Sequence, residues 1–286
     1  MKALGIIANC GKPRASAVLA ELSERAGELG LELHASGDTA AMLPGVCHEP
    51  LPDVFEAADV VVALGGDGTM LTAVRELDGA DVPLIGVNIG SLGFMTSVAE
   101  QDLSAALECL QDDTYIVSER VVAECVVTHS GGIARYCALN DVVVSSGASS
   151  RVITLDVTVG GKDVTSYVCD GLIVSTPTGS TGHSLSAGGP ILIPEINAFL
   201  ISPICPHTLS SRPLVVPDTS KIIIEVNDHS DHDARLSVDG QVGLALSRGD
   251  SVGVSRCKQN VRFLHLPDYD YFEVMRQKLR WRGSNV

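Results

Sequence analysis

The sequence contains a turn whose residue types could handle phosphate. Gly65-Gly66-Asp67-Gly68-Thr69 directly follows the apolar run from Val60 to Leu64. Glycines after a buried strand let backbone N–H groups approach an anion, and the next helix directs its positive end at the same place. A phosphate loop usually adds a lysine, whereas this turn supplies a carboxylate. Asp67 could accept the proton of a hydroxyl group that attacks phosphorus, or it could merely bond its own turn.

Two further segments carry polar groups where apolar ones are expected. A run rich in Thr, Ser and Gly extends from Thr176 to Gly189, with Leu185 as its one large apolar residue, which favours a ligand-binding loop over an ordinary surface loop. Asn140 and Asp141 interrupt an otherwise apolar strand, so at least one of them points towards the core or a ligand. An edge strand or a bulge would also explain this pair.

Composition limits the class of protein. The chain has 286 residues, 45% of them hydrophobic, which is enough for two domains with large cores. Its net charge of −15 excludes a broad electrostatic footprint for nucleic acid or anionic lipid. Eight cysteines show no metal-binding spacing and are typical of reduced thiols in a cytoplasmic protein. We expect no secretory leader and no membrane span.

The secondary-structure pattern around these residues differs between two parts of the chain. Residues 1–117 alternate strands and helices, which predicts an α/β domain with a parallel, Rossmann-like sheet and Gly65 to Thr69 at its carboxyl edge. Within it, 16–30 has helical spacing with Gly30 as the C-cap. Residues 118–266 are a succession of strand-like runs, which predicts an all-β domain with a hairpin turn at Gly160-Gly161. Residues 267–286 form a helical tail, with Phe272, Met275 and Leu279 on one side, that returns to the first domain.

Together, these segments resemble the NAD kinase family. The matching stretches are "GGDGTML", "GVNIGSLGFM", "ALNDVVVS", "DGLIVSTPTGSTGHSLSAGGPIL", "PICPHTLSSRPLVVP" and "SVDGQ", in family order and covering most of residues 60–241. The resemblance implies transfer of the γ-phosphate of ATP, or in some members of polyphosphate, to the 2′-hydroxyl of the adenosine ribose of NAD, giving NADP. It also implies a divalent cation such as Mg²⁺, a cytoplasmic location, and a homodimer or homotetramer.

The resemblance assigns roles residue by residue. Asp67 would be the base, and Asp67 and Gly68 would border the NAD site. Phosphate contacts would come from Gly65, Gly66, Gly68 and Thr69. The other positions that match residues lining the NAD site are Asn140, Asp141, Arg151, Asp170, Thr181, Gly182, His183, Ser184, Leu185, Ser186 and Gln241. No protein side chain is assigned to the metal.

Three departures from the family pattern bear on function. The usual Asn-Glu is Asn140-Asp141, a frequent basic residue is Val168, and a usual tyrosine is His183. Asp141 is one methylene shorter than the usual Glu, which we expect to be tolerated. Val168 bears on the preference between NAD and NADH and on an anion contact there, and His183 bears on the stacking and hydrogen bonding expected at that position. Two alternatives stay open at this point: a lipid or sugar kinase that shares only the Gly-rich turn, and a nucleotide-binding regulator that kept the fold without turnover.

Overall fold

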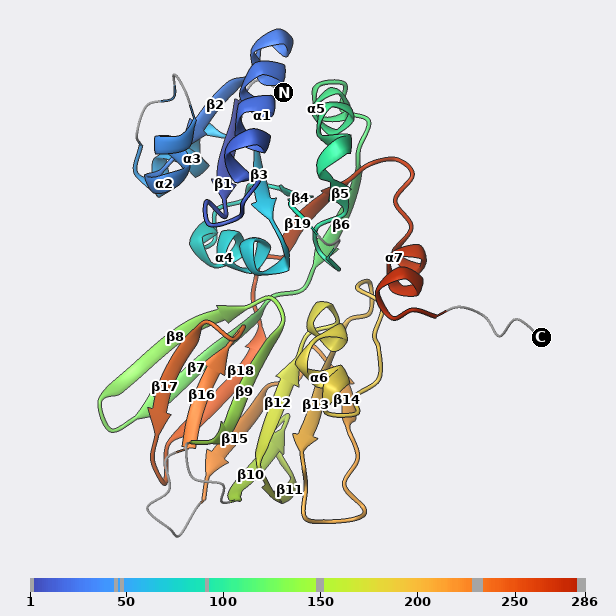
Figure 1. Cartoon of the computed structure of the whole chain (residues 1–286). Helices are drawn as coiled ribbons and strands as arrows, with labels where there is room; N and C mark the ends of the chain where they lie inside the picture. Colours follow the sequence, from blue (N-terminus) through green and yellow to red (C-terminus); the bar gives the residue numbers. More distant parts are fainter. Residues whose placement is uncertain are drawn as a thin grey trace, which may run out of the picture. The chain divides into compact units, whose positions relative to one another are not determined.

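The computed structural model describes residues 3–43, 46, 49–90, 93–147, 152–227 and 234–281. The chain forms two compact units (Figure 1): the first comprises residues 1–119 and 261–286, and the second comprises residues 120–260. Among the described residues, no helix combines the length and apolar character that crossing a membrane requires.

The first unit contains a seven-stranded sheet in the order β2-β1-β3-β4-β19-β6, with β5 paired to β4. Neighbouring strands from β2 to β4, together with the β4 pairs to β5 and β19, run parallel. The strands are β1 (Ala3–Ala8), β2 (Glu32–Ala35), β3 (Val60–Gly65), β4 (Leu84–Asn88), β5 (Val98–Ala99), β6 (Ile116–Arg120) and β19 (Val261–His265).

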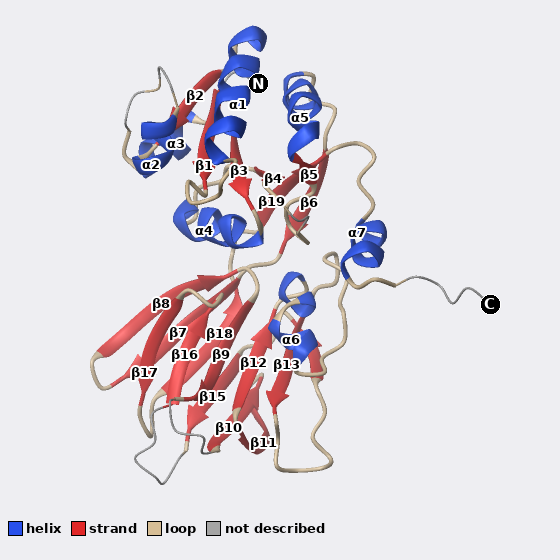
Figure 2. Cartoon of the chain, viewed as in Figure 1, coloured by secondary structure: helices blue, strands red, loops and turns tan. Residues whose placement is uncertain are grey.

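Helices cover both faces of this sheet (Figure 2). On one face, α1 and α5 pack in a core with Leu4, Ile6 and Val62. On the other face, a side chain at Gly5 would meet Val54 of α3, and one at Gly86 would meet Met70 of α4. The helices are α1 (Ala15–Leu29), α2 (Gly37–Met42), α3 (Leu51–Ala57), α4 (Asp67–Leu77), α5 (Leu103–Gln111) after a short 3-10 turn (Glu100–Asp102), and α7 (Tyr271–Lys278).

The second unit consists of two six-stranded sheets, in the orders β11-β10-β15-β18-β7-β8 and β14-β13-β12-β9-β16-β17. Alternate residues of both sheets, such as Val127, Leu155, Val144 and Phe199, form one core. The strands are β7 (Ala123–His129), β8 (Gly132–Ala138), β9 (Asp141–Ser146), β10 (Ile153–Val159), β11 (Lys162–Cys169), β12 (Gly171–Ser175), β13 (Ala198–Ile204), β14 (Leu214–Pro217), β15 (Ile222–Val226), β16 (Ala234–Val238), β17 (Val242–Leu246) and β18 (Ser251–Arg256).

The Thr/Ser/Gly run folds against β12 and β13 rather than forming an open loop. It forms a 3-10 turn, η2 (Thr178–Thr181), and a single-turn helix, α6 (His183–Ser186). The Ser184 hydroxyl lies 2.8 Å from the Ser202 hydroxyl of β13, and the Leu192 N–H donates to Ser180 Oγ at 2.9 Å. Hydroxyl side chains therefore satisfy this segment internally, which is why Thr176 to Ser180 are buried.

Most predicted elements are present. The fold class is confirmed, α1 ends at Gly30 in the left-handed conformation (φ 70°), and Gly160 and Gly161 form the β10–β11 turn with φ of 58° and 77°. The strand that Asn140 and Asp141 were expected to interrupt is two strands, because 133–146 breaks between β8 and β9. Residues 234–246 form the β16–β17 hairpin.

The C-terminal part differs in two details. Residues 261–265, which we assigned to the β-rich domain, form β19 in the parallel sheet of the first unit, so the chain returns at Val261. The tail helix α7 buries Val274 and Met275, whereas Phe272 is 53% exposed. Met275 is therefore buried as expected, but Phe272 is not part of the buried face, which centres on Val274 and Met275.

Candidate active site

Asp67 is the first residue of α4 and lies beyond the carboxyl end of β3 in the parallel sheet. Its carboxylate accepts hydrogen bonds from three successive backbone N–H groups of the segment after β4. Oδ2 accepts from Phe94 N at 2.9 Å, and Oδ1 accepts from Met95 N at 2.9 Å and from Thr96 N at 3.3 Å. Asp67 therefore does not bond its own turn, and the side chain is held in one orientation.

These contacts occupy three lone-pair positions of the Asp67 carboxylate and leave one for a further donor. A carboxylate offers about four lone-pair sites, two on each oxygen. Oδ1 of Asp67 serves two donors, whereas Oδ2 serves one. Because Asp67 is half-buried rather than enclosed, the remaining site on Oδ2 is the position at which a hydroxyl group could be accepted.

Gly93 makes this arrangement possible. A Cβ at position 93 would lie 1.9 Å from Asp67 Oδ1 and 2.5 Å from Thr96 Oγ1, so no other residue fits without displacing the carboxylate. The Gly93 N–H donates to Thr96 Oγ1 at 3.2 Å, and Thr96 is fully buried. The stretch "GVNIGSLGFM" matches a family motif, but the sequence does not indicate that it holds the Asp67 carboxylate.

The predicted phosphate-binding glycines differ in what surrounds them. A Cβ at Gly65 would lie 2.1 Å from Thr69 Oγ1, so Gly65 is required by the protein's own packing. At Gly66 and Gly68 a Cβ would meet no described residue within 4 Å, and neither has a positive φ. Thr69 is buried and accepts from Gly66 N at 3.4 Å, which places it in the turn's support.

In the second unit, Leu139, Asn140 and Asp141 connect β8 to β9, and the protein satisfies all their backbone groups. Their N–H groups donate to the Asp239 carboxylate at 2.9, 2.8 and 3.0 Å. The Leu139 carbonyl accepts from Thr176 Oγ1, the Asn140 carbonyl from Thr176 N, and the Asp141 carbonyl from Asp239 N. A ligand at this connection would therefore meet the side chains of Asn140 and Asp141 rather than their backbone.

The Thr/Ser/Gly run is in direct contact with this connection. A Cβ at Gly179 would lie 2.1 Å from the Asn140 carbonyl oxygen, so only glycine fits there. Thr181, Gly182, His183, Leu185 and Ser186 follow on η2 and α6, where Gly182, His183 and Ser186 are exposed and Thr181 and Leu185 are half-buried. Ser184 is fully buried against Ser202, which argues against a direct contact between its side chain and a ligand.

The remaining predicted residues are spread more widely. Gln241 is exposed in the turn after Asp239, next to the Asn140 connection. Asp170 precedes β12, whereas Asp141 pairs with Ser175 at the other end of that strand. Asp170 is five residues from Ser175, the residue that pairs with Asp141, and at 3.3–3.4 Å per residue this separation along the strand is roughly 17 Å. No single ribose or base could contact both Asp170 and Asp141. Arg151 lies outside the described residues.

Asp141 has an unusual electrostatic environment. Burial, and to a lesser extent the negative charge of Asp239, raises the pKa of the Asp141 carboxyl from 3.8 to about 7. The neighbouring strand β12 pairs Ser175 with Asp141 and is followed by Thr176, and neither residue carries a charge. Asp141 is therefore poised to change charge near neutral pH.

The donor set fits a cation that arrives with its substrate. Among the described residues, no group of three or more His, Cys, Asp or Glu side chains gathers as a ready-made metal site. The open position on the Asp67 carboxylate is the one that a hydroxyl group would occupy, and Mg²⁺ that enters with its substrate brings phosphates and several waters as ligands.

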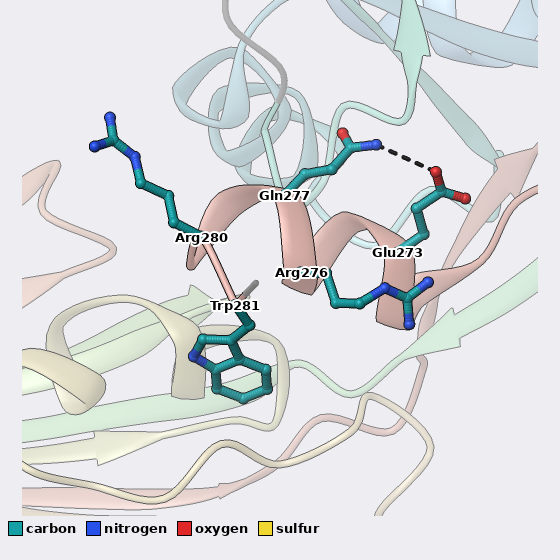
Figure 3. A pocket seen from close by; sticks show the side chains of 5 residues that line it. All are labelled: Glu273, Arg276, Gln277, Arg280 and Trp281. Carbon is teal, nitrogen blue, oxygen red and sulfur yellow. Dashed lines mark hydrogen bonds between the residues drawn. The ribbon is translucent and has the colours of Figure 1, made fainter. Parts of the chain in front are cut away.

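A cavity elsewhere on the first unit is unrelated to these residues. It has a volume of about 410 Å³ and is lined by Glu273, Arg276, Gln277, Arg280 and Trp281, all from α7 and the residues after it (Figure 3). None of the predicted site residues lines it. Glycine packing and bonded carboxylates mark two other places instead, Asp67 in the first unit and the Asn140–Asp141 connection in the second.

Sequence reasoning missed three residues that build these two groups: Gly93, Gly179 and Asp239. Each stands inside a quoted motif, so the stretches were identified but the internal roles were not. Contacts between segments 26 to 100 residues apart, such as Asp67 with Gly93 and Asp239 with Leu139, leave no periodic pattern in a sequence.

Comparison with known proteins covers both units. The description "ATP-NAD kinase N-terminal domain" matches residues 4–115, and "ATP-NAD kinase C-terminal domain" matches residues 139–266. The chain is 41% identical to the NAD kinase of Syntrophotalea carbinolica and 42% identical to that of Citrifermentans bemidjiense, over 98% of this chain and 99% of each relative.

Solved structures agree with these matches. A yeast NADH kinase, crystallised with NADH, has 25% identity and a TM-score of 0.92 over 99% of this chain and 89% of its own. An NAD kinase from Archaeoglobus fulgidus, crystallised with ATP, shares the fold with a TM-score of 0.77 at 24% identity, over 99% of this chain and 100% of its own. Since full-length relatives and both domain descriptions coincide, this chain belongs to the NAD kinase family.

Proposed function

We propose that this chain phosphorylates the 2′-hydroxyl of the adenosine ribose of NAD, with ATP as the donor and NADP as the product. The observation that carries the proposal is the Asp67 turn. It combines a carboxylate fixed by three backbone N–H groups with two glycines, Gly66 and Gly68, whose missing side chains the protein's own packing does not explain.

The chemistry follows from this turn. The ribose hydroxyl donates its hydrogen to Oδ2 of Asp67, the atom with a free lone pair. The hydroxyl oxygen forms a bond to the γ-phosphorus of ATP, the bond from that phosphorus to the bridging oxygen breaks, and ADP leaves. Gly66 and Gly68 let the backbone approach the phosphates. A Mg²⁺ ion bound to ATP would offset the charge repulsion between the phosphates and Asp67.

The second unit supplies recognition of NAD. The side chains of Asn140 and Asp141 would hold the ribose or other polar edges of NAD, because their backbone is already bonded within the protein. Exposed groups at Gly182, His183 and Ser186 would border the ligand. The family resemblance adds a homodimer or homotetramer in the cytoplasm to the proposal, and light scattering of the purified protein would measure the assembly.

One assay tests the activity. Purified protein is incubated with ATP, Mg²⁺ and NAD, and NADP is measured with an NADP-specific dehydrogenase. We expect NADP to form only when all three are present, and ADP to appear in equal amount. NADH, polyphosphate and diacylglycerol serve as comparisons for acceptor and donor. Nucleotide binding without any NADP formation would instead identify a regulator that kept the fold.

A further inference from the structure

Asp239 connects two parts of the second unit that are far apart in sequence. It lies in the turn between β16 and β17, yet its carboxylate accepts from the backbone N–H groups of Leu139, Asn140 and Asp141, which lie 98 to 100 residues earlier. Oδ2 accepts from Leu139, and Oδ1 accepts from both Asn140 and Asp141. We call this set of three hydrogen bonds the Asp239 clamp.

The conformation of the turn supports this contact. Asp239 has a φ of 51° and Gly240 a φ of 68°, both in the left-handed region, which Asp and Gly tolerate better than other residues. An Asp-Gly pair is common in hairpins for that reason alone. The clamp goes further, because the side chain bonds to a different connection, and the Asp239 N–H returns a hydrogen bond to the Asp141 carbonyl at 2.9 Å.

We propose that Asp239 is a positioning residue for NAD: it fixes the β8–β9 connection so that the side chains of Asn140 and Asp141 are presented to the ligand. This inference rests on the proposed function, in which these two side chains hold NAD. Three donors converge on two oxygens, so a carboxylate is required. An asparagine would turn its amide N–H₂ towards one of the N–H groups, and an alanine would leave all three without this partner.

The clamp also affects the charge of the ligand-binding residue. Asp239 contributes to the raised pKa of Asp141, together with burial, and β12 contributes no charge beside it. If Asp141 accepts a hydrogen bond from a hydroxyl of NAD, its ionised form binds more tightly. The Michaelis constant for NAD should then fall as pH rises through about 7. Removing the charge of Asp239 should move this change to lower pH.

Asp239→Asn, Asp239→Ala and Asp250→Asn form the test set. Asp250 is a matched control because its Oδ2 accepts from Ser247 N at 2.7 Å in the next turn, after β17, at the opposite end of that strand. Four properties of each variant are measured: steady-state kinetics against NAD and ATP, the pH profile of the Michaelis constant for NAD, thermal melting, and calorimetric NAD binding.

For Asp239→Asn we expect a Michaelis constant for NAD that rises on the order of ten-fold, since a hydrogen bond to a charged group is lost. The constant for ATP should stay within about two-fold, and the pH profile for NAD should shift towards acid. Asp239→Ala should show a larger rise, whereas Asp250→Asn should lower the melting temperature without changing either profile.

The outcomes separate this inference from the proposed function. An active parent together with an Asp239→Asn variant that keeps the parent's NAD constant and pH profile would overturn the positioning role and leave the function intact. A parent that makes no NADP would overturn the function. In that case calorimetry still decides the clamp, because an unchanged NAD affinity in both Asp239 variants would contradict it. Asp239→Asn is nearly isosteric, so it remains informative if Asp239→Ala does not fold.

Discussion

The Asp67 carboxylate is bonded within the protein before any substrate is present. Three of its roughly four lone-pair sites accept from Phe94, Met95 and Thr96. A base that is already oriented needs no reorganisation when the hydroxyl arrives, which is the condition under which a positioned group contributes most to a rate. The same contacts mean that replacing Asp67 changes both the proton acceptor and the segment that holds it.

For Asp67→Asn we expect a loss of turnover number on the order of 10²–10⁴-fold, because the amide cannot take the proton. NAD binding should be largely retained, since Asn is nearly the same size. The matched control is Thr96→Val, which loses the hydrogen bond from Gly93 N and loosens the same segment but keeps the carboxylate. Turnover of Asp67→Asn within a few-fold of the parent, or an equally large loss in Thr96→Val, would contradict the role of base.

Asp141 should make stability depend on pH. Its carboxyl has a pKa of about 7 in the folded chain against an ordinary 3.8, so between these values the folded state holds a proton that the unfolded state has lost. Stability from this group therefore falls as pH rises from about 4 to about 7. Asp141→Asn removes the burial of a charge, so its melting temperature relative to the parent should be higher at pH 8 than at pH 5. A difference that is the same at both pH values would argue against a buried carboxylate.

At the scale of elements, the turn from β3 to α4 contains glycines with two different purposes. Gly65 is required by Thr69, which lies 2.1 Å from where a Cβ would stand. Gly66 and Gly68 have open space at the same position, so no residue that the structure describes excludes alanine. A ligand is then the remaining reason for a glycine at either place, and substitution can separate the two purposes.

We expect Gly66→Ala and Gly68→Ala to melt at or above the parent's temperature and to raise the Michaelis constant for ATP on the order of ten-fold or more. A methyl group there would block backbone hydrogen bonds to charged phosphate, worth about 1.5–3 kcal/mol each. Gly65→Ala should lose stability instead. Gly27→Ala, in α1 with open space, is the control and should gain about 0.5–1 kcal/mol without changing kinetics. Unchanged constants for ATP in both variants would place the phosphates elsewhere.

Helices and strands whose apolar residues repeat with one regular period could be predicted from the sequence. The helix at 15–29 and the strands before Gly65 and Asn88 follow from spacing and from glycine, because local chain geometry determines them. The break between Ala138 and Asp141 does not, since the connection is held by Asp239 about 100 residues later. Likewise, the sequence of β19 predicts a strand but not the sheet to which it belongs. Only its pairing with Leu84 of β4 places it in the parallel sheet.

The same distinction between local pattern and long-range contact applies to the site residues. Asp67 was identified because a Gly-rich turn follows an apolar strand, and Asn140 and Asp141 because they interrupt an apolar run. Both signals are visible in the sequence alone. Ser184 was assigned to the NAD site by its match to the family motif, and its side chain is buried against Ser202 of β13. Exposure of a hydroxyl depends on which face of a segment packs on the sheet, and a run composed of Ser, Thr and Gly has too little hydrophobic contrast to indicate that face.

At the scale of the whole molecule, the residues assigned to NAD belong to both units. Asp67 and Gly68 lie in the first, and Asn140, Asp141 and the α6 segment lie in the second, while the chain crosses between the units at residues 119–120 and 260–261. A ligand stabilises the folded state of whatever contributes to its binding. NAD should therefore stabilise both units rather than one.

Differential scanning calorimetry with and without NAD tests this. At about 100 times its dissociation constant, a ligand adds about 2.7 kcal/mol to the free energy of unfolding, so the whole unfolding endotherm should move to higher temperature. Asp67→Asn should show nearly the same shift, because it keeps NAD binding, whereas Asn140→Ala should lose most of it. Lys162→Ala, at the exposed β10–β11 turn, should behave as the parent. A shift confined to part of the endotherm would mean that residues of one unit alone hold NAD, and an undiminished shift in Asn140→Ala would move the ligand away from the β8–β9 connection.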